Sequence, residues 1–262
     1  MRAKLAAYWY GKTVLITGAS SGLGAAITEA LAPYGVHFGL LSRRVEEMQT
    51  LAGKHKNSGS TFWINACDVR NREEVLAAVR AFHQHAGRLD AVWVNSGVGG
   101  DTSFRRWNYE KMENMIDTNL KGAIYTIMAS LEIMVPQNSG AIIGICSAAS
   151  MRGIGARGVY SLTKIGLTYF MESMAVELPQ IQFTTIHPGF VDTPLNRGNP
   201  NRMWLMMPEP AAQLMIKAVA RRKRVFLYPG QMKIFYRLVR LLPTRLYRWL
   251  GHKALDLGRP KG

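Results

Sequence analysis

Short apolar runs alternate along this chain with longer segments in which apolar residues recur at helical spacing. The short runs predict buried strands at 12–17, 36–41, 61–66, 91–94, 141–146, 181–186 and 224–228. Helical spacing predicts one helix that ends near residue 32 and others at 72–85, 109–135 and 160–178. Because strands and helices alternate without a repeat or linker, we expect one doubly wound α/β domain over residues 1–228. Its parallel seven-stranded sheet would carry helices on both faces.

A glycine-rich turn follows the first predicted strand and precedes the first of these helices. This order places backbone N–H groups at a helix N-terminus, where a pyrophosphate binds well. Gly18 permits the tight turn, Gly22 lets the backbone approach the phosphates, and Gly24 allows the helix to pack closely on the strand. The turn therefore predicts a Rossmann-type dinucleotide site formed by Gly18, Ser20, Ser21, Gly22, Leu23 and Gly24.

The end of the second predicted strand indicates which dinucleotide would bind. An acidic residue at this position binds the ribose 2′-hydroxyl of NAD. This chain has instead a hydroxyl followed by two guanidiniums, Ser42, Arg43 and Arg44, which suit a 2′-phosphate. The alternative is a pair of solvated arginines that open a helix, where the helix dipole disfavours cations. We therefore favour NADP(H) as the cofactor.

Polar and small residues also follow the third and fourth predicted strands. Both strand ends fall on the carboxyl edge of the sheet, where doubly wound folds bind ligands. We expect cofactor contacts from Asp68, Val69, Asn95, Ser96 and Gly97.

Three further polar residues lie on predicted helices. Asn119 lies inside the predicted helix 109–135, although asparagine is a poor helix former. Its side chain either faces solvent, or bonds backbone and water beside the site. His83 and His85 lie on the predicted helix 72–85, which we expect to be exposed, and we assign them no functional role.

A tyrosine, a lysine and a serine in the segment 147–164 predict acid–base chemistry. Tyr160 and Lys164 are four residues apart, so a helix that begins near Tyr160 places them on one face. A lysine ammonium beside a phenol favours the phenolate, so Lys164 would lower the pKa of Tyr160 from its usual value of about 10. Ser147 follows an apolar strand, where its hydroxyl could polarise a carbonyl. A tyrosine and a lysine at this spacing usually carry no function; the separate cofactor site gives the trio its significance.

The segment after the sixth predicted strand completes the predicted site. His187 is interpreted as a strand-end residue rather than a base, and Pro188, Gly189, Val191 and Thr193 are expected at the cofactor. A substrate lid is expected at about 193–212, where an apolar methionine- and tryptophan-rich cluster, 203–207, is bracketed by prolines. This cluster could equally pack on the core or on a neighbouring subunit. An apolar pocket wall is expected from Met151 and Ile154.

The net charge of +16 is concentrated in the C-terminal tail. From Lys217 onward there are thirteen Lys or Arg and one acid, so the tail carries +12 and the first 216 residues carry +4. Residues 229–262 form a basic amphipathic extension, with a break at Pro243. Its cations are Lys233, Arg237, Arg240 and Arg248, and its apolar residues are Ile234, Leu238, Leu241, Leu242, Trp249 and Leu250. An interfacial membrane helix is favoured over a dimer-docking helix, and nucleic-acid binding is third.

The remaining composition excludes several classes of protein. Cys67 and Cys146 lack metal-ligand spacing, so we expect buried thiols in a reducing compartment, no disulfide and no metal site. The N-terminus has no signal-peptide core, and no apolar run approaches the roughly 18 residues of a spanning helix. We expect a cytoplasmic protein, or one peripheral to the inner face of a membrane.

Taken together, these motifs resemble the short-chain dehydrogenase/reductase family in its oxidoreductase form of about 250 residues. The resemblance covers about residues 11–228. One departure is Ser96, where the family usually has alanine, a change that leaves the backbone contact intact. The motif residues are Thr17, Gly18, Gly22, Gly24, Asp68, Asn95, Ser96, Gly97, Asn119, Ser147, Tyr160, Lys164, Pro188 and Gly189.

The resemblance implies a role for each of these positions. Tyr160 would be the general acid in reduction and the base in oxidation, tuned by Lys164, which would also hold the nicotinamide ribose. Ser147 would polarise the carbonyl, and Asn119 would anchor a proton-relaying water. Asp68 and Val69 would flank the adenine, residues 95–97 would line the cofactor channel, and residues 188–193 would contact the carboxamide.

The function expected from the sequence is NADP-dependent hydride transfer. The substrate would be a carbonyl or secondary alcohol of a hydrophobic small molecule, and the resemblance implies a homodimer or homotetramer. The alternative is a cofactor-binding scaffold or regulator without turnover. The presence of Asn119, Ser147, Tyr160 and Lys164 together argues against that alternative.

Overall fold

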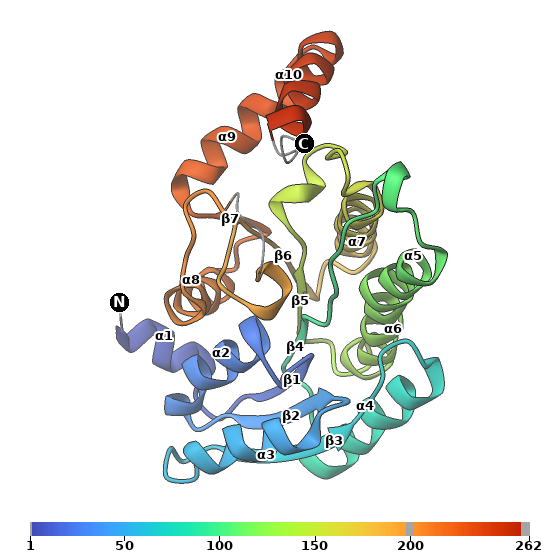
Figure 1. Ribbon diagram of the computed structural model, residues 1–262. Coiled ribbons are helices and arrows are strands. Elements are labelled where there is room, and N and C mark those ends of the chain that lie inside the picture. The colour runs from blue at the N-terminus through green and yellow to red at the C-terminus, as the bar shows by residue number, and fades with distance from the viewer. Residues whose placement is uncertain (1, 198–201, 258–262) are drawn as a thin grey trace.

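The computed structural model describes residues 2–197 and 202–257. Residues 198–201 of the expected lid and 258–262 of the expected tail lie outside the described residues. Seven parallel strands form one sheet in the order β3-β2-β1-β4-β5-β6-β7, which confirms the predicted doubly wound fold (Figure 1). The strands are β1 (Thr13–Thr17), β2 (His37–Ser42), β3 (Thr61–Ala66), β4 (Ala91–Val94), β5 (Ala141–Ile145), β6 (Gln182–Pro188) and β7 (Val225–Tyr228).

Helices cover both faces of the sheet (Figure 1). One face carries α1 (Arg2–Trp9), α2 (Gly22–Leu31), α3 (Val45–Lys54) and α8 (Pro208–Ala220). The other carries α4 (Arg72–Ala86), α5 (Tyr109–Ile116), α6 (Gly122–Met134) and α7 (Gly158–Glu177).

Two apolar cores follow from the alternation of side chains along the strands. In β1, Val14 and Ile16 belong to the core under α2 and α8, whereas Leu15 belongs to the core under α4 and α6. Successive residues of a strand point to opposite faces, so a strand covered on both sides is buried at every position and mostly apolar. All five residues of β1 and of β5 are buried accordingly.

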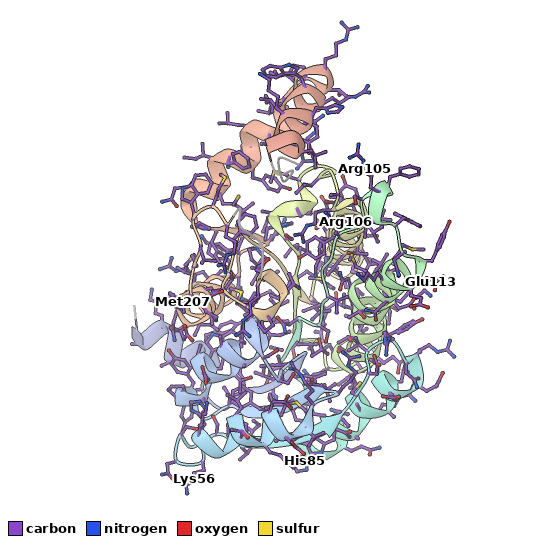
Figure 2. The ribbon with its side chains drawn as sticks, in the orientation of Figure 1. Lys56, His85, Arg105, Arg106, Glu113 and Met207 are labelled. Carbon is purple, nitrogen blue, oxygen red and sulfur yellow. The ribbon has the colours of Figure 1, made fainter. Side chains whose placement is uncertain are left out.

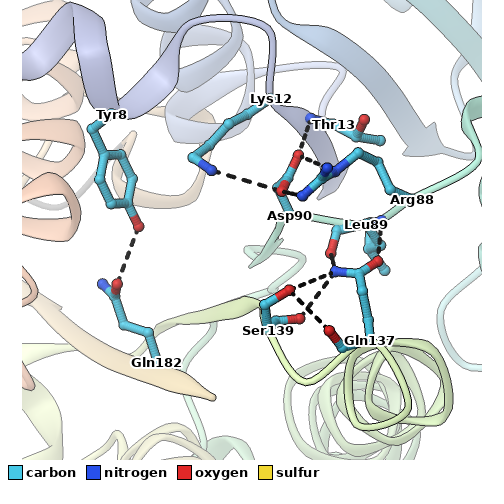
Figure 3. A network of polar contacts seen from close by, with 9 residues as sticks. All are labelled: Tyr8, Lys12, Thr13, Arg88, Leu89, Asp90, Gln137, Ser139 and Gln182. Atoms are coloured by element: carbon cyan, nitrogen blue, oxygen red, sulfur yellow. Dashed lines mark hydrogen bonds and ion pairs between the residues drawn. The ribbon is translucent and has the colours of Figure 1, made fainter. Parts of the chain in front are cut away.

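Polar side chains hold the strands together at the amino edge of the sheet (Figure 3). The Asp90 carboxylate accepts hydrogen bonds from the Thr13 N–H at 2.9 Å and from the Arg88 guanidinium, and it lies 3.7 Å from Lys12 Nζ. Gln137 bonds both backbone groups of Leu89, which joins the end of α6 to the start of β4. These contacts fix the strand starts, and the carboxyl ends carry the polar residues predicted for the site.

The N-terminal helix α1 was not predicted. Its Trp9 is fully buried, stacks on Trp93 at 6.2 Å and donates from Nε1 to the Ile216 carbonyl. Tyr8 donates to Gln182 at the start of β6 (Figure 3). The helix therefore closes the core beside α8.

Two helical predictions need correction. The predicted helix 109–135 is divided into α5 and α6 by a π-helical turn, Asp117–Lys121. This turn adds a residue to the helical repeat, and such bulges occur frequently at functional sites. His83 on α4 is half-buried, whereas His85 is exposed as predicted, because the face of α4 that packs on the sheet extends to His83.

The C-terminal segment forms two helices, α9 (Gly230–Leu241) and α10 (Thr244–Leu257), which rise beyond the end of β7 (Figure 1). The break between them contains Pro243, where the sequence predicts one. Among residues 2–197 and 202–257, no helix is long and apolar enough to cross a bilayer.

Candidate active site

A cavity of about 1150 Å³ opens at the carboxyl ends of the strands. It brings together every predicted site residue except Gly24 and Asn119, which lie directly behind its wall. From the predicted set, its lining includes Gly18, Ser20, Ser21, Gly22, Leu23, Ser42, Arg43, Arg44, Asp68, Val69, Asn95, Ser96, Gly97, Ser147, Tyr160, Lys164, Pro188, Gly189, Val191 and Thr193.

The glycine turn between β1 and α2 has no room for a side chain at Gly18 or Gly24. Gly18 has a φ of +66°, and a Cβ there would lie 3.0 Å from the Ser96 Cα. A Cβ on Gly24 would overlap the Gly18 carbonyl oxygen. The Asn95 amide donates to the carbonyls of Thr17 and Gly18, at 3.0 and 3.2 Å, and so holds the turn against β4. The turn exposes the N-terminal backbone of α2 to the cavity.

The residues at the end of β2 form a small polar network with this turn. The Arg44 guanidinium donates to the hydroxyls of Ser20 and Ser21, at 2.9 and 2.7 Å. Ser42 donates to Ser20 at 2.8 Å. Arg43 extends to the other side, with its guanidinium 3.9 Å from the Asp68 carboxylate. Two cations therefore border the cavity here, and only Arg44 holds the turn.

Asp68 and Val69 follow β3 and have different surroundings. The Arg70 guanidinium, hydrogen-bonded to Asp68, holds the pKa of this carboxyl below its ordinary value. Val69 is buried, and a Cβ on Gly122 would lie 2.9 Å from the Val69 Cβ. The start of α6 therefore packs directly against this part of the cavity wall.

Asn119 lies in the π-helical turn and is fully buried. Its Oδ1 accepts from the Val98 N–H at 2.7 Å, and its Nδ2 donates to the Val98 carbonyl at 2.8 Å and to Thr163 at 3.3 Å. Of the two predicted alternatives, exposure to solvent is therefore wrong. The side chain fixes the loop after β4, which carries Gly97, and links it to α7.

The loop after β5 holds Ser147 in place through three contacts. The Ser147 hydroxyl accepts from the Ala149 N–H at 3.1 Å. Its carbonyl accepts from the Ser150 hydroxyl at 2.6 Å and lies 3.1 Å from His187 Nδ1. His187 is buried at the end of β6 and lies 2.9 Å from the Ser150 Oγ. Burial lowers the pKa of His187, which favours its neutral form.

Tyr160 and Lys164 lie one turn apart on α7, and both line the cavity. The Lys164 Nζ donates to the Ile145 carbonyl at 2.9 Å and lies 5.9 Å from the centre of the Tyr160 ring. Burial raises the pKa of Tyr160 and outweighs the opposing interaction with Ser147. Burial also lowers the pKa of Lys164. The predicted lowering of the tyrosine pKa is therefore wrong for this structure, because desolvation dominates.

The cavity that contains Ser147 and Tyr160 has several apolar lining residues, together with the cation Arg157. The predicted wall residues Met151 and Ile154 line it, together with Met203. Within the expected lid, Met206 pairs with Val191 in a short bridge and packs on the core, whereas Trp204 is partly exposed. Met206 therefore packs on the core, as one of the two alternatives predicts, and the lid stays a prediction.

Sequence reasoning missed two groups of site residues. Met232 and Phe235 on α9 line the cavity, although the predicted C-terminal extension had no assigned place in the site. His187 supports the Ser147 loop. Nothing in the local pattern identifies these residues, since each role depends on contacts with segments distant in sequence. The predicted buried thiols are confirmed: burial raises the pKa of Cys67 to about 12 and that of Cys146 to about 11.

Comparison with known proteins agrees with this arrangement. The short chain dehydrogenase family model matches residues 12–203. An uncharacterized oxidoreductase of Myxococcus xanthus is 36% identical over 239 residues, which cover 90% of this chain and 94% of the relative.

Solved structures show the same fold. A short-chain type dehydrogenase/reductase from Mycobacterium marinum has a TM-score of 0.79 at 24% identity, covering 85% of this chain and 96% of its own. An alcohol dehydrogenase from Thermococcus sibiricus, complexed with 5-hydroxy-NADP, has a TM-score of 0.76 at 27% identity, covering 83% of this chain and 94% of its own. The chain belongs to the short-chain dehydrogenase/reductase family of oxidoreductases.

Proposed function

We propose that this protein is an NADP(H)-dependent oxidoreductase that interconverts a carbonyl and a secondary alcohol on a hydrophobic substrate. The observation that carries the proposal is the convergence of Ser147, Tyr160 and Lys164 on the cavity that also contains the glycine turn. A proton donor, a second hydroxyl and an ammonium border one apolar space. This set is suited to proton transfer at a carbonyl oxygen.

The residues present fit a dinucleotide. A Cβ on Gly18 would press on Ser96 and a Cβ on Gly24 on the Gly18 carbonyl, so both glycines keep the turn tight enough for the backbone at the start of α2 to approach a pyrophosphate. Ser42, Arg43 and Arg44 provide a hydroxyl and two guanidiniums at the end of β2, which suit a 2′-phosphate. The Thermococcus sibiricus relative, complexed with 5-hydroxy-NADP, supports the choice of NADP over NAD.

The dinucleotide, when bound, would supply or accept the hydride. The chain itself handles the proton. In reduction, the Tyr160 hydroxyl donates its proton to the carbonyl oxygen, while the Ser147 hydroxyl hydrogen-bonds the same oxygen. The Tyr160 phenol is protonated at neutral pH, since its ordinary pKa is about 10 and burial raises it further, so its proton moves only as negative charge develops on the carbonyl oxygen. In oxidation, the phenolate accepts the proton, and the nearby Lys164 ammonium stabilises it.

The supporting residues keep this pair in position. Asn119 holds both backbone groups of Val98, and a Cβ on Gly97 would lie 3.4 Å from Asn119 Oδ1 and Lys164 Nζ. Met151, Ile154, Met203, Met232 and Phe235 form an apolar wall, which supports a hydrophobic substrate.

Tyr160→Phe tests the proposal. The phenylalanine keeps the ring and removes the proton donor, so turnover of a panel of ketones should fall by at least about 100-fold. NADPH affinity, measured by fluorescence titration, should change less than about threefold, since only one polar group is lost.

Tyr169→Phe is the matched control, because Tyr169 lies on the same helix with an exposed ring, and it should retain full turnover. Turnover that survives in Tyr160→Phe contradicts the catalytic assignment. If the wild type binds NADPH and turns over no member of the panel, the non-catalytic scaffold is the better interpretation.

We also propose that the chain assembles as a homo-oligomer through α7. Leu162, Tyr169 and Val176 are spaced by seven residues and are all exposed, so they form one apolar stripe along this helix. A stripe of this kind can pair with its own copy about a two-fold axis, because such an interface needs only self-complementarity.

A further inference from the structure

The two C-terminal helices expose an apolar face. On α9, Ile234, Leu238 and Leu241 are 60–80% exposed and follow the i, i+4, i+7 spacing of one helix face. On α10, Leu246, Trp249 and Leu250 are 41–53% exposed at the spacing i, i+3, i+4. Exposed apolar residues grouped on helix faces in this way indicate an interaction site. We call α9 and α10 together the helical arm.

The helical arm is also strongly basic. Its six cations are Lys233, Arg237, Arg240, Arg245, Arg248 and Lys253. Among the residues whose side chains the structure describes, which leaves out Asp256, none of them has a carboxylate at ion-pair distance. Lys253 lies 4.0 Å above the Trp249 ring. Six cations with no acidic partner among the described side chains, beside exposed leucines and a tryptophan, complement a surface that is both anionic and apolar. Anionic phospholipid bilayers have this chemistry.

The helical arm is fixed to the loop that follows Ser147. Arg152 Nη1 donates to the carbonyls of Val239 and Leu242, at 3.2 and 2.7 Å, and its guanidinium lies 4.2 Å from the centre of the Tyr247 ring. The Tyr247 hydroxyl donates to the Gly153 carbonyl at 2.7 Å. Arg152 therefore caps α9 and holds α10 at the same time. The arm is positioned by the loop whose Met151 and Ile154 line the substrate side of the cavity.

Helix α9 also contributes side chains to the cavity wall. Met232 and Phe235 of α9 line the cavity, and Phe235 contacts Trp204 edge-on at 6.1 Å. The apolar face of α9 thus continues from the cavity wall to the exposed surface.

A second exposed aromatic lies at this end of the molecule. Phe104 is 96% exposed and precedes Arg105 and Arg106, which Figure 2 shows at the same end as α10. The segment is held there by a hydrogen bond from the Thr102 N–H to the Ala156 carbonyl, in the loop that contacts α10. An aromatic beside cations is a further feature of surfaces that enter the bilayer interface.

We propose that the helical arm is a docking surface for anionic phospholipid bilayers, and that docking brings the substrate side of the cavity to the lipid. The delivery of substrate from the lipid rests on the proposed oxidoreductase function, whereas the docking itself does not. The ligand is the bilayer surface, and the substrates favoured by this arrangement are carbonyl compounds that partition into it.

Vesicle co-sedimentation of the full chain tests the docking. The probes are vesicles of phosphatidylcholine alone and of phosphatidylcholine mixed with phosphatidylglycerol. The wild type should bind the mixed vesicles and release at high salt, because the attraction is screened. Replacing three cations (Arg237→Gln, Arg240→Gln, Arg245→Gln) should weaken binding on the order of 100-fold. Replacing three apolar residues (Leu238→Ser, Leu241→Ser, Trp249→Ser) should also weaken it by at least about tenfold.

Matched controls come from the opposite end of the molecule. Lys54→Gln with Lys56→Gln removes exposed cations there, and Figure 2 shows Lys56 far from α10. Tyr10→Ser removes an apolar ring that is 79% exposed. Both controls should bind vesicles like the wild type. Equal binding of neutral and mixed vesicles, or loss of binding in the controls, overturns the proposal.

Light scattering without lipid identifies the competing occupant. A dimer that dissociates in the apolar arm variant, with no vesicle binding by the wild type, means that a second copy covers the face and overturns the proposal. Binding to DNA without binding to vesicles overturns it as well.

Activity measurements test the delivery of substrate separately from docking. With a long-chain ketone carried in mixed vesicles, NADPH oxidation by the wild type should exceed that of both arm variants by at least about tenfold. With a short water-soluble ketone, all three should be equal. Vesicle binding without this difference overturns the delivery of substrate and leaves docking supported. Absence of turnover on every ketone, with Tyr160→Phe identical to the wild type, contradicts the oxidoreductase function instead.

Discussion

Arg43 and Arg44 are adjacent in sequence, but their different contacts predict different roles in cofactor selection. Arg44 holds Ser20 and Ser21 of the glycine turn, whereas Arg43 contacts none of the turn residues and lies 3.9 Å from Asp68. Arg43→Ala should therefore weaken NADPH on the order of tenfold, the usual effect of a charge-assisted bond, and leave NADH nearly unchanged. Arg44→Ala should weaken both cofactors, because the turn itself loosens. Fluorescence titration with NADPH and NADH measures both effects.

The control for this pair is Arg72→Ala, which removes an exposed arginine outside the cavity and should change neither affinity. If Arg43→Ala lowers NADPH and NADH affinity equally, Arg43 does not read a 2′-phosphate.

His187 gives a prediction that depends on pH. Burial lowers its pKa, so the unfolded chain binds a proton at His187 more readily than the folded chain does. The free energy of unfolding should therefore decrease as the pH falls below about 6.5, the ordinary histidine value. His187→Leu removes this contribution, so its stability should fall less than that of the wild type between pH 7.5 and pH 5.5, as measured by urea unfolding. A parallel pH dependence in both proteins would contradict it.

The same substitution should affect catalysis through Ser147. Without Nδ1 beside the Ser147 carbonyl and the Ser150 hydroxyl, the loop loses two contacts, so kcat should fall several-fold while NADPH affinity holds. His187→Asn, which retains a nearby polar group, should recover part of the loss. This recovery distinguishes positioning of Ser147 from a general loss of packing.

Among individual residues, the sequence predicted those whose role is local and missed those whose role is tertiary. Gly18, Tyr160 and Lys164 act through spacing within one turn or one helix, which the sequence displays directly. His187 acts on a loop 37 residues away. The pKa of Tyr160 was predicted in the wrong direction, because burial raises it and the spacing of two residues does not reveal burial.

At the scale of elements, α1 gives a prediction about stability. Trp9 is fully buried between Trp93 and α8, and its Nε1 bonds the Ile216 carbonyl. Trp9→Ala should lower the free energy of unfolding by about 3–5 kcal/mol, since it leaves a large cavity and removes a buried hydrogen bond. Urea unfolding measures this loss. Tyr10→Ala, on an exposed neighbour, is the control and should cost less than about 0.5 kcal/mol; equal losses would mean that α1 does not pack in solution as described.

The strands were easier to predict than the helices at the ends of the chain. A strand buried on both faces must be a continuous apolar run, so β1, β4 and β5 are visible in the sequence. Helix α1 has only eight residues and is stabilised by contacts with α8, which no local pattern displays. The π-helical turn was also not predicted, although Asn119, a poor helix former inside the predicted helix 109–135, indicated an irregularity there. Helix α9 was predicted as amphipathic, but its inward residues Met232 and Phe235 were not.

For the molecule as a whole, contacts that stabilise the sheet lie at one edge and the residues of the candidate site lie at the other. Ion pairs and amide contacts around Asp90 and Gln137 join the strand starts (Figure 3). The opposite edge carries the glycine turn, Ser147 and the cavity. Side chains at the first edge can be fully satisfied within the protein, which leaves the carboxyl edge to bind ligands, as in other doubly wound folds.

At the largest scale, the proposed homo-oligomer depends on the exposed apolar stripe of α7. The stripe of Leu162, Tyr169 and Val176 lies on α7, the helix that carries Tyr160, so a partner copy there would brace the catalytic helix from outside. Val176, which is 81% exposed, is the position where a charge would act most directly on a two-fold contact. Val176→Asp should therefore lower the mass measured by light scattering, because each interface would bury two unpaired carboxylates. Tyr10→Asp, on an equally exposed ring remote from α7, should leave the mass unchanged, and a monomeric wild type would exclude the oligomer altogether.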